Sequence, residues 1–312
     1  MEILRDPTTV HLPRPTVLTI GSFDGIHRGH QHLIGRVVAR AQEIGAASAL
    51  VTLHPHPKLV LRPNSNLQYL STIEERLDLL APLGLDYAVV FPFSLETSQI
   101  RARDFAQLLL DHLRMKEIFC GADFALGHKR EGNVTFLRAL GDEKGFQVTV
   151  VEPQQFDGEI MSSSRIRQLI AAGDLDDATR FLGRYPSVRG RVVKGDQRGR
   201  QLGFPTANLA IAEHRLIPAD GIYAVRVRIG DQWRGGAANI GIRPTFDSGH
   251  RLVEVYVLDF DGDLYDQVIE AQFIQRLREE RKFDRIDALI EQMKRDVDET
   301  RKVLATIRPE GF

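Results

Sequence analysis

The chain has 312 residues, enough for two domains of ordinary size. Its hydrophobic fraction of 43% excludes a disordered protein, and its net charge of −1 gives no reason to expect a nucleic-acid partner. The single cysteine, Cys120, excludes an internal disulfide framework and is typical of a reducing compartment, so we expect a cytoplasmic protein. No signal peptide or membrane-spanning run is expected, because the first 14 residues and the rest of the chain lack a long apolar segment.

In the first part of the chain, up to about residue 183, short apolar runs alternate with segments that have helical spacing of apolar residues. This alternation predicts a parallel, doubly wound sheet that binds ligands beyond the carboxyl ends of its strands. The predicted strands are 17–20, 47–53, 87–91, 117–120 and 147–151, and the predicted helices are 31–44, 73–83, 102–113 and 134–144.

The most informative segment is residues 21–30, Gly-Ser-Phe-Asp-Gly-Ile-His-Arg-Gly-His, between the first predicted strand and helix. A glycine-rich turn there places free backbone N–H groups and the positive end of a helix dipole where a phosphate can bind. His27 and His30 are three residues apart, so both imidazoles can lie on one face and stabilise charge at phosphorus. Helix capping is an alternative, as is a zinc site, although no third ligand follows closely.

Residues 162–167, Ser-Ser-Ser-Arg-Ile-Arg, begin another predicted helix. Serine is a good helix cap, which is one interpretation of this segment. Hydroxyls, free N–H groups and two arginines can also hold a polyphosphate. The residues alone leave both interpretations open.

Beyond residue 183 the helical signals stop and short strand patterns separated by Gly, Pro and Asp turns follow. We therefore predict a first domain at 1–183, a linker at 184–188 and a second domain at 189–312. Five or six short strands favour a small antiparallel barrel, and the amphipathic segment 285–307 predicts a long helix packed on it. The predicted strands are 188–193, 206–211, 222–229, 233–240 and 252–260.

A second chemical signature lies in this mainly-β part. Thr206 and Asn208 are two residues apart in a predicted strand, so they point to one face and offer the hard oxygen ligands that Mg²⁺ prefers. Residues 194–200 form either a flap over a nucleotide or an ordinary surface hairpin. Glu254 alternates with valines and is either a solvent-facing carboxylate or a general base aimed into the barrel mouth.

Together these motifs resemble the bacterial bifunctional riboflavin kinases/FAD synthetases, and the resemblance extends from about residue 18 to about residue 298. It implies that the first domain transfers AMP from ATP to FMN, giving FAD and pyrophosphate, and that the second phosphorylates riboflavin. The motifs that carry it are 21–30, Pro55-His56-Pro57, 121–127, 199–208, 239–245, Glu254, 259–265 and 273–278.

For the first domain, the resemblance implies that His27 and His30 stabilise the α-phosphate in the transition state. Asp123 would lie beside the flavin phosphate or a metal. The residues implied to bind ATP and its phosphates are Gly21, Phe23, Gly25, His56, Ser163, Ser164 and Arg167.

For the second domain, the resemblance implies that Glu254 activates the ribityl hydroxyl and that Thr206 and Asn208 bind Mg²⁺. Mg²⁺ would serve both sites, the substrates would be ATP, riboflavin and FMN, and the oligomeric state stays open. The other implied residues are Gly195, Gly199, Arg200, Gly203 and Pro205 on the nucleotide side, and Asn239 and Arg243 on the flavin side.

Four residues depart from the family pattern: His54, Ala122, Leu126 and Asp266. None removes an implied catalytic group, and Asp266 matters most because it replaces a glycine, which accepts a positive φ more readily. Two alternative functions remain: an adenylyltransferase for another small phosphate or carboxylate with an accessory barrel, and a flavin-binding module without catalysis. The trio Thr206, Asn208 and Glu254 disfavours an accessory barrel, which has no need of them.

Overall fold

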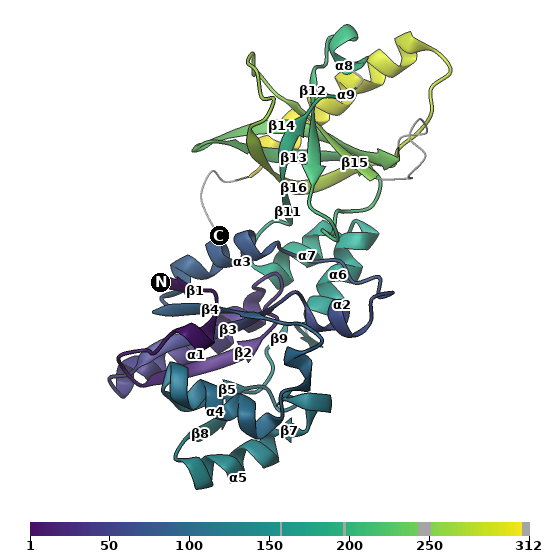
Figure 1. Cartoon of the computed structure of the whole chain (residues 1–312). Helices are drawn as coiled ribbons and strands as arrows, with labels where there is room; N and C mark the ends of the chain where they lie inside the picture. Colours follow the sequence, from purple (N-terminus) through teal and green to yellow (C-terminus); the bar gives the residue numbers. More distant parts are fainter. Residues whose placement is uncertain (157, 196–197, 243–250, 308–312) are drawn as a thin grey trace. The chain divides into compact units, whose positions relative to one another are not determined.

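The computed structural model describes residues 1–156, 158–195, 198–242 and 251–307 (Figure 1). The chain divides into two compact units, Met1–Ser163 and Ser164–Phe312. Helices α6 (Ser163–Ala172) and α7 (Leu175–Leu182) thus group with the second unit almost entirely. The linker that we expect at 184–188 comes later in the chain than this division and stays a prediction.

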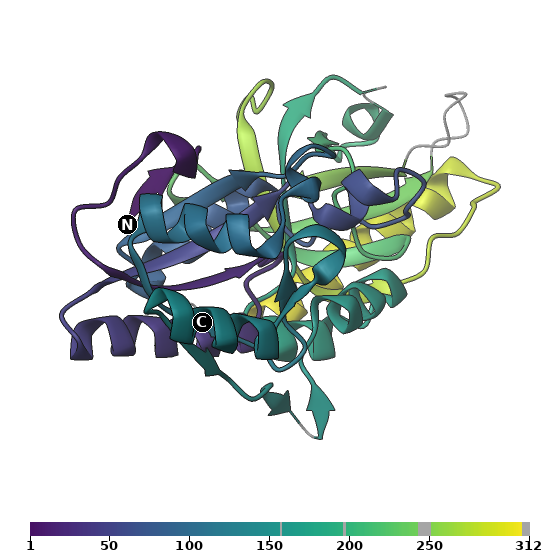
Figure 2. The ribbon, with the colours of Figure 1, turned by 60° about the horizontal axis from the view of Figure 1, so that its bottom comes forward.

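The first unit is built on a six-stranded parallel sheet with the order β1-β4-β3-β2-β5-β8 (Figures 1 and 2). The predicted doubly wound sheet is therefore confirmed, and its order reverses between β2 and β5. In such sheets the reversal is the point at which ligands bind. The strands are β1 (Glu2–Leu4), β2 (Thr16–Gly21), β3 (Ala47–His54), β4 (Tyr87–Pro92), β5 (Met115–Cys120) and β8 (Gln147–Val150).

Helices cover both faces of this sheet because neighbouring strand residues point to opposite sides. Val17 packs with Ile34 of α1 and Leu77 of α3, whereas Leu18 packs with Leu109 of α4 and Leu137 of α5. Both faces of β2 are buried, as is typical of a central parallel strand. The helices are α1 (Arg28–Glu43), α3 (Ile73–Leu80), α4 (Ala102–Leu113) and α5 (Val134–Lys144).

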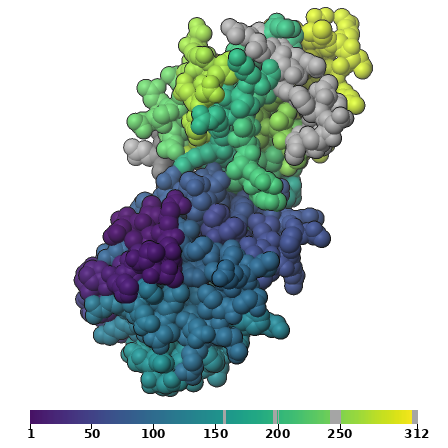
Figure 3. All heavy atoms as spheres, viewed as in Figure 1, coloured from purple at the N-terminus to yellow at the C-terminus, as the bar shows by residue number. Residues whose placement is uncertain are grey.

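Several short elements of this unit were not predicted. The edge strand β1 is only three residues long and lies in the N-terminal segment, which is purple on the surface in Figure 3. Helix α2 (Pro57–Leu61) has five residues and begins at a proline, so neither element is long enough to show a period in the sequence. Two short antiparallel pairs complete the unit: β6 (Ala125–Leu126) with β7 (Gly132–Asn133), and β9 (Gln155–Phe156) with β10 (Glu159–Ile160).

The second unit is a closed antiparallel barrel with the strand order β11-β12-β15-β14-β13-β16. The barrel was predicted, but β16 was not among its predicted strands, although Glu270 and Gln272 alternate with core residues as is typical of a half-buried strand. The strands are β11 (Ser187–Val193), β12 (Thr206–Ile211), β13 (Gly221–Ile229), β14 (Gln232–Ile242), β15 (Arg251–Val257) and β16 (Val268–Arg278).

The long C-terminal helix, α9 (Ile286–Ala305), packs on the outside of the barrel, as predicted. Its Val303 contacts a small apolar cluster that includes Ala224 and Ile274. A two-pronged ion pair also holds it, because Arg278 donates to both carboxylate oxygens of Asp296, at 2.9 and 2.7 Å. Short helix α8 (Arg198–Gln201) lies between β11 and β12.

Candidate functional sites

The turn after β2 carries the two histidines and has an unusual backbone. Gly25 has φ of 82°, and the non-glycine residues Phe23 and Ile26 also have positive φ, 47° and 37°. A left-handed conformation is rare for a β-branched residue such as isoleucine. Both Phe23 and Ile26 are buried in the core beneath the turn. Packing therefore helps to keep this strained turn in place.

His27 and His30 lie together at the start of α1. Their rings stack with centroids 3.6 Å apart, and Phe23 contacts the ring of His30 edge-on at 5.1 Å. His27 caps the helix, since its Nδ1 accepts from the backbone N–H of His30 at 3.4 Å. That bond assigns the ring proton of His27 to Nε2. A side chain at Gly29 would press on the His27 ring, at 3.2 Å.

The predicted alternative of helix capping is confirmed for His27, whose ring also stacks on that of His30 at the start of α1. For zinc, the described parts of the chain contain no group of three or more His, Cys, Asp or Glu side chains placed to hold a metal ion. Because β2 and β5 flank the reversal of strand order, the turn lies where a doubly wound sheet binds its ligand.

Other predicted residues of the first unit follow the carboxyl ends of neighbouring strands. Asp123 follows β5 and is exposed, and its carbonyl accepts from Arg130 at 2.8 Å. His56 follows β3 and caps α2, with its backbone N–H donating to the hydroxyl of Tyr69 at 2.7 Å. Ser163 donates its hydroxyl to the carbonyl of Asp24 at 3.0 Å. Ser164 and Arg167 lie further along α6, in the second unit.

Two titratable side chains near these strand ends have shifted pKa values. Burial and the charge of Arg76 lower the pKa of His54, which therefore stays neutral at neutral pH. Burial raises the pKa of Cys120 to about 11, so its thiol stays protonated. Cys120 is therefore a buried side chain with an unreactive thiol.

In the barrel, three polar side chains lie at one level across three neighbouring strands. Asn208 of β12 is directly opposite Glu254 of β15, which is opposite Asn239 of β14. Their neighbours Val253 and Val255 fill the barrel core, so Glu254 lies on the outer face. The side chain of Glu254 therefore does not point into the barrel core, and its role as a general base stays a prediction.

Thr206 shares this outer face with Asn208, because the intervening Ala207 belongs to the barrel core. The face therefore offers hydroxyl, amide and carboxylate oxygens, the donor set that Mg²⁺ prefers. The amide oxygen of Asn239 is buried and has no hydrogen-bond partner among the described residues, so it is available to a ligand or water. These residues fit a hard cation.

Two glycines of the predicted flap are required by close packing. A side chain at Gly195 would lie within 2.5 Å of the Asn208 amide, and one at Gly199 within 2.3 Å of the Phe204 carbonyl. Residues 198–201 form α8 in the connection between the antiparallel strands β11 and β12. Arg200 lies in α8, but its side chain is outside the described part, as is all of Arg243. Gly203 has φ of 85°, which favours glycine.

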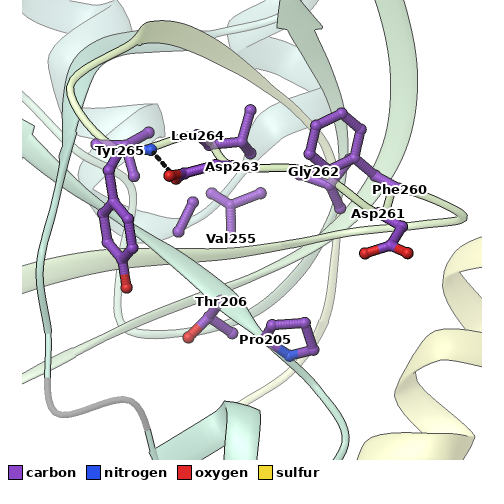
Figure 4. Close-up of a pocket in the computed structure, with 12 residues that line it drawn as sticks. Pro205, Thr206, Val255, Phe260, Asp261, Gly262, Asp263, Leu264 and Tyr265 are labelled. Atoms are coloured by element: carbon purple, nitrogen blue, oxygen red, sulfur yellow. Dashed lines mark hydrogen bonds between the residues drawn. The ribbon is translucent and has the colours of Figure 1, made fainter.

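A pocket of about 370 Å³ opens beside Thr206 and Pro205. Figure 4 shows these two residues on one side of it and residues 260–265 on the other. Within residues 260–265, the backbone N–H of Tyr265 donates a hydrogen bond to the Asp263 carboxylate, at 2.9 Å. Asp266, the departure from glycine, follows with φ of 62°. The remaining lining is mostly apolar: Val192, Ala207, Val255, Val257, Phe260 and Leu264.

Sequence reasoning missed two parts of these sites. Phe260 and Tyr265 belong to a quoted motif, but nothing in the residues assigned the motif to a pocket. Asp24, also within a quoted motif, contacts Leu70 and Ser71, which are 46 and 47 residues away. Contacts between residues so far apart leave no periodic signal in the sequence. The burial of an Asp in a folded structure does indicate that its carboxylate has a partner.

Comparisons with known proteins agree with the division of the chain into an N-terminal and a C-terminal unit. A family model described as FAD synthetase matches residues 10–165, and one described as riboflavin kinase matches residues 182–304. Bifunctional riboflavin kinase/FMN adenylyltransferases from Pseudomonas fluorescens and Listeria monocytogenes are 37% and 36% identical to the chain. Each alignment covers 94% and 93%, respectively, of both chains.

A solved structure described as a macrolide-efflux protein from Streptococcus pneumoniae is also similar. It is 30% identical, has a TM-score of 0.86, and the match covers 96% of this chain and 99% of that one. Among the described residues, no helix is both long and apolar enough to cross a membrane.

Proposed function

The chain belongs to the family of bifunctional riboflavin kinases/FMN adenylyltransferases, and from this premise we propose how its residues divide the work. The FAD synthetase part is N-terminal and the riboflavin kinase part is C-terminal. ATP, riboflavin and FMN are its substrates. The roles of individual residues below are our proposal.

In adenylyl transfer, a phosphate oxygen of FMN attacks the α-phosphorus of ATP. The bond from that phosphorus to the β-bridging oxygen breaks, and pyrophosphate leaves. His27 and His30 donate hydrogen bonds to the α-phosphate oxygens as charge develops. Their stacked arrangement at the switch point supports this role. Such reactions depend mainly on positioning and electrostatics, for which a rigid turn is well suited.

The other residues of this site bind the two substrates. Gly21, Phe23 and Gly25 shape the turn over the nucleotide, and His56 contacts ATP from the end of β3. Asp123 lies on the flavin side, after β5. The residues that we assign to the departing phosphates are Ser163, Ser164 and Arg167.

In the kinase reaction, the terminal ribityl hydroxyl of riboflavin attacks the γ-phosphorus of ATP and ADP leaves. Glu254 accepts the hydroxyl proton. Thr206 and Asn208 would hold Mg²⁺, which neutralises phosphate charge when bound. Asn239 and Arg243 lie on the flavin side. The observation that supports this assignment is the cross-strand register of Asn208 and Glu254, in which the amide-bearing residue is directly opposite the carboxylate-bearing one.

The pocket beside Thr206 suits the adenine of ATP. It is largely apolar and includes the aromatic rings of Phe260 and Tyr265. Thr206 at its edge leads to the face that carries Asn208. The residues that we assign to the nucleotide side, besides Thr206, are Gly195, Gly199, Arg200, Gly203 and Pro205.

Two variants test the assignment of the two sites. His30→Ala is expected to lower FMN adenylylation by about 100-fold or more and to leave riboflavin phosphorylation within about twofold. Glu254→Gln is expected to have the opposite pattern when FMN is supplied, because the base is lost but the first unit is unchanged. Each activity is measured separately by chromatography of the flavin products. A His30→Ala enzyme that is folded but equally impaired in both reactions contradicts the assignment.

A further inference from the structure

The turn that carries the histidines needs an anchor, because its backbone is strained at more than one residue. Phe23 and Ile26 both have positive φ. Each such conformation costs on the order of 1 kcal/mol or more for a residue other than glycine. Strain of this kind persists only where the surrounding contacts fix the backbone.

Asp24, between these two residues, is the centre of such contacts. Its side chain is only 1% exposed, and its carboxylate accepts from the backbone N–H groups of Leu70 and Ser71, at 2.9 and 3.0 Å. The Ser71 hydroxyl also donates to it, at 3.2 Å, and accepts from the N–H of Gly25, at 3.0 Å. The loop before α3 therefore holds two successive residues of the turn.

Arg76 connects the same turn to β3. Its side chain is 1% exposed and one terminal nitrogen lies 3.7 Å from the Asp24 carboxylate. The other donates to the hydroxyl of Thr52, at 2.9 Å, and Thr52 donates to the carbonyl of Ser22, at 3.0 Å. Burying the charges of Asp24 and Arg76 costs desolvation energy that uncharged side chains would avoid. The pair is therefore better explained by a function than by stability alone.

Asp24 also contacts the phosphate-binding segment that we assign. Ser163 donates its hydroxyl to the Asp24 carbonyl, at 3.0 Å. One residue is thus linked to the histidine turn and to the start of α6. These are the two places at which the α-phosphate and the departing pyrophosphate are held in our assignment.

We propose that Asp24, Ser71 and Arg76 are positioning residues for adenylyl transfer, which hold the strained turn in the conformation that stacks His27 on His30. None of them needs to touch the reacting atoms. Their loss lets the turn relax, and a misplacement of about 1 Å at a reacting group can cost about 100-fold in rate. This inference rests on the function proposed above for the histidines.

The test compares Asp24→Asn and Ser71→Ala with a matched control, Glu117→Gln. Glu117 is another buried carboxylate of the first unit, bonded to Arg40 at 2.9 Å and to Thr149 at 2.5 Å. It lies in β5, and its two partners belong to α1 and β8, outside the turn. All three variants are made in the full chain, and both activities are assayed well below the lowest melting temperature.

Asp24→Asn is expected to lower kcat for FMN adenylylation by about 100-fold and Ser71→Ala by about tenfold, with KM for FMN changed by less than about threefold. Glu117→Gln is expected to lower the melting temperature but to keep kcat within about twofold. Riboflavin phosphorylation should stay within about twofold in all three. If Asp24→Asn does not fold, Ser71→Ala, which removes one hydroxyl, decides the question alone.

An unchanged kcat in the folded variants overturns the inference, as does an equal fall in kcat for Glu117→Gln. The His30→Ala variant separates this failure from a failure of the proposed function. If His30→Ala abolishes adenylylation and Asp24→Asn does not affect it, only the positioning role is wrong. If His30→Ala is itself fully active, the function proposed for the turn is wrong.

Discussion

At the scale of single residues, His54 shows how burial and a nearby charge set a protonation state. It ends β3, and burial and Arg76 lower its pKa below the ordinary value of 6.5. Its Nδ1 is buried and has no hydrogen-bond partner among the described residues. A proton there is therefore poorly solvated, so folding favours the neutral ring.

This predicts how stability depends on pH. Between the lowered pKa of the folded state and 6.5, the unfolded chain binds more protons than the folded chain at His54. Its stabilising contribution is therefore present above pH 6.5 and is lost as the pH falls through that range. Between pH 7.5 and pH 5.5, the melting temperature of the His54→Gln variant should fall less than that of the unaltered protein, as measured by circular dichroism. Equal losses in both proteins contradict this prediction.

At the scale of elements, we expect one largely buried ion pair to contribute more to the packing of helix α9 on the barrel than its exposed charges do. The two bonds from Arg278 to Asp296 are largely buried, and Gln292 donates a third bond to Asp296 at 2.8 Å. By contrast, the pair of Glu291 and Arg295 is well exposed. Exposed pairs contribute little because solvent screens them, whereas removing one partner of a buried pair leaves the other uncompensated.

Asp296→Asn should therefore lower the free energy of unfolding of the second unit by about 2–3 kcal/mol. Glu291→Gln, the matched control, should change it by less than about 0.5 kcal/mol. The only tryptophan, Trp233, lies in β14 of the barrel, so its fluorescence during urea unfolding reports on this unit. A similar effect of both substitutions would show that the ion pair does not hold the helix.

The same scale shows what the sequence could predict. Apolar runs with clear periods identified the central strands of the sheet, four of its helices and five strands of the barrel. Helix α2 and strand β1 were not predicted because they are too short to show a periodic pattern of apolar residues. Strand β16 was missed although its polar and apolar residues partly alternate, which is a signal of a half-buried strand.

The sites were predictable to the extent that chemistry is local in sequence. The spacing of His27 and His30 anticipated their stacking, and that of Thr206 and Asn208 anticipated their shared face. Contacts between distant segments were not predictable, as Asp24 with Ser71 shows. Both orientations of Glu254 stayed open in the sequence, because alternation assigns a residue to a face but does not say which face is the core.

At the scale of the whole molecule, one chain carries two phosphorus-centred reactions in sequence. FMN is the product of the second unit and the substrate of the first. A reaction that starts from riboflavin and ATP should therefore contain FMN as an intermediate. Each unit has its own buried core. We therefore expect that substitutions separate the two activities, which share the flavin FMN.

The most direct test is a time course of the purified chain with riboflavin, ATP and Mg²⁺, followed by chromatography of the flavins. The account predicts that FMN appears first, without a lag, and that FAD appears after a lag as FMN accumulates. His30→Ala should stop the course at FMN, and Glu254→Gln should leave riboflavin unconverted. Absence of both FMN and FAD with the unaltered chain would contradict the central claim.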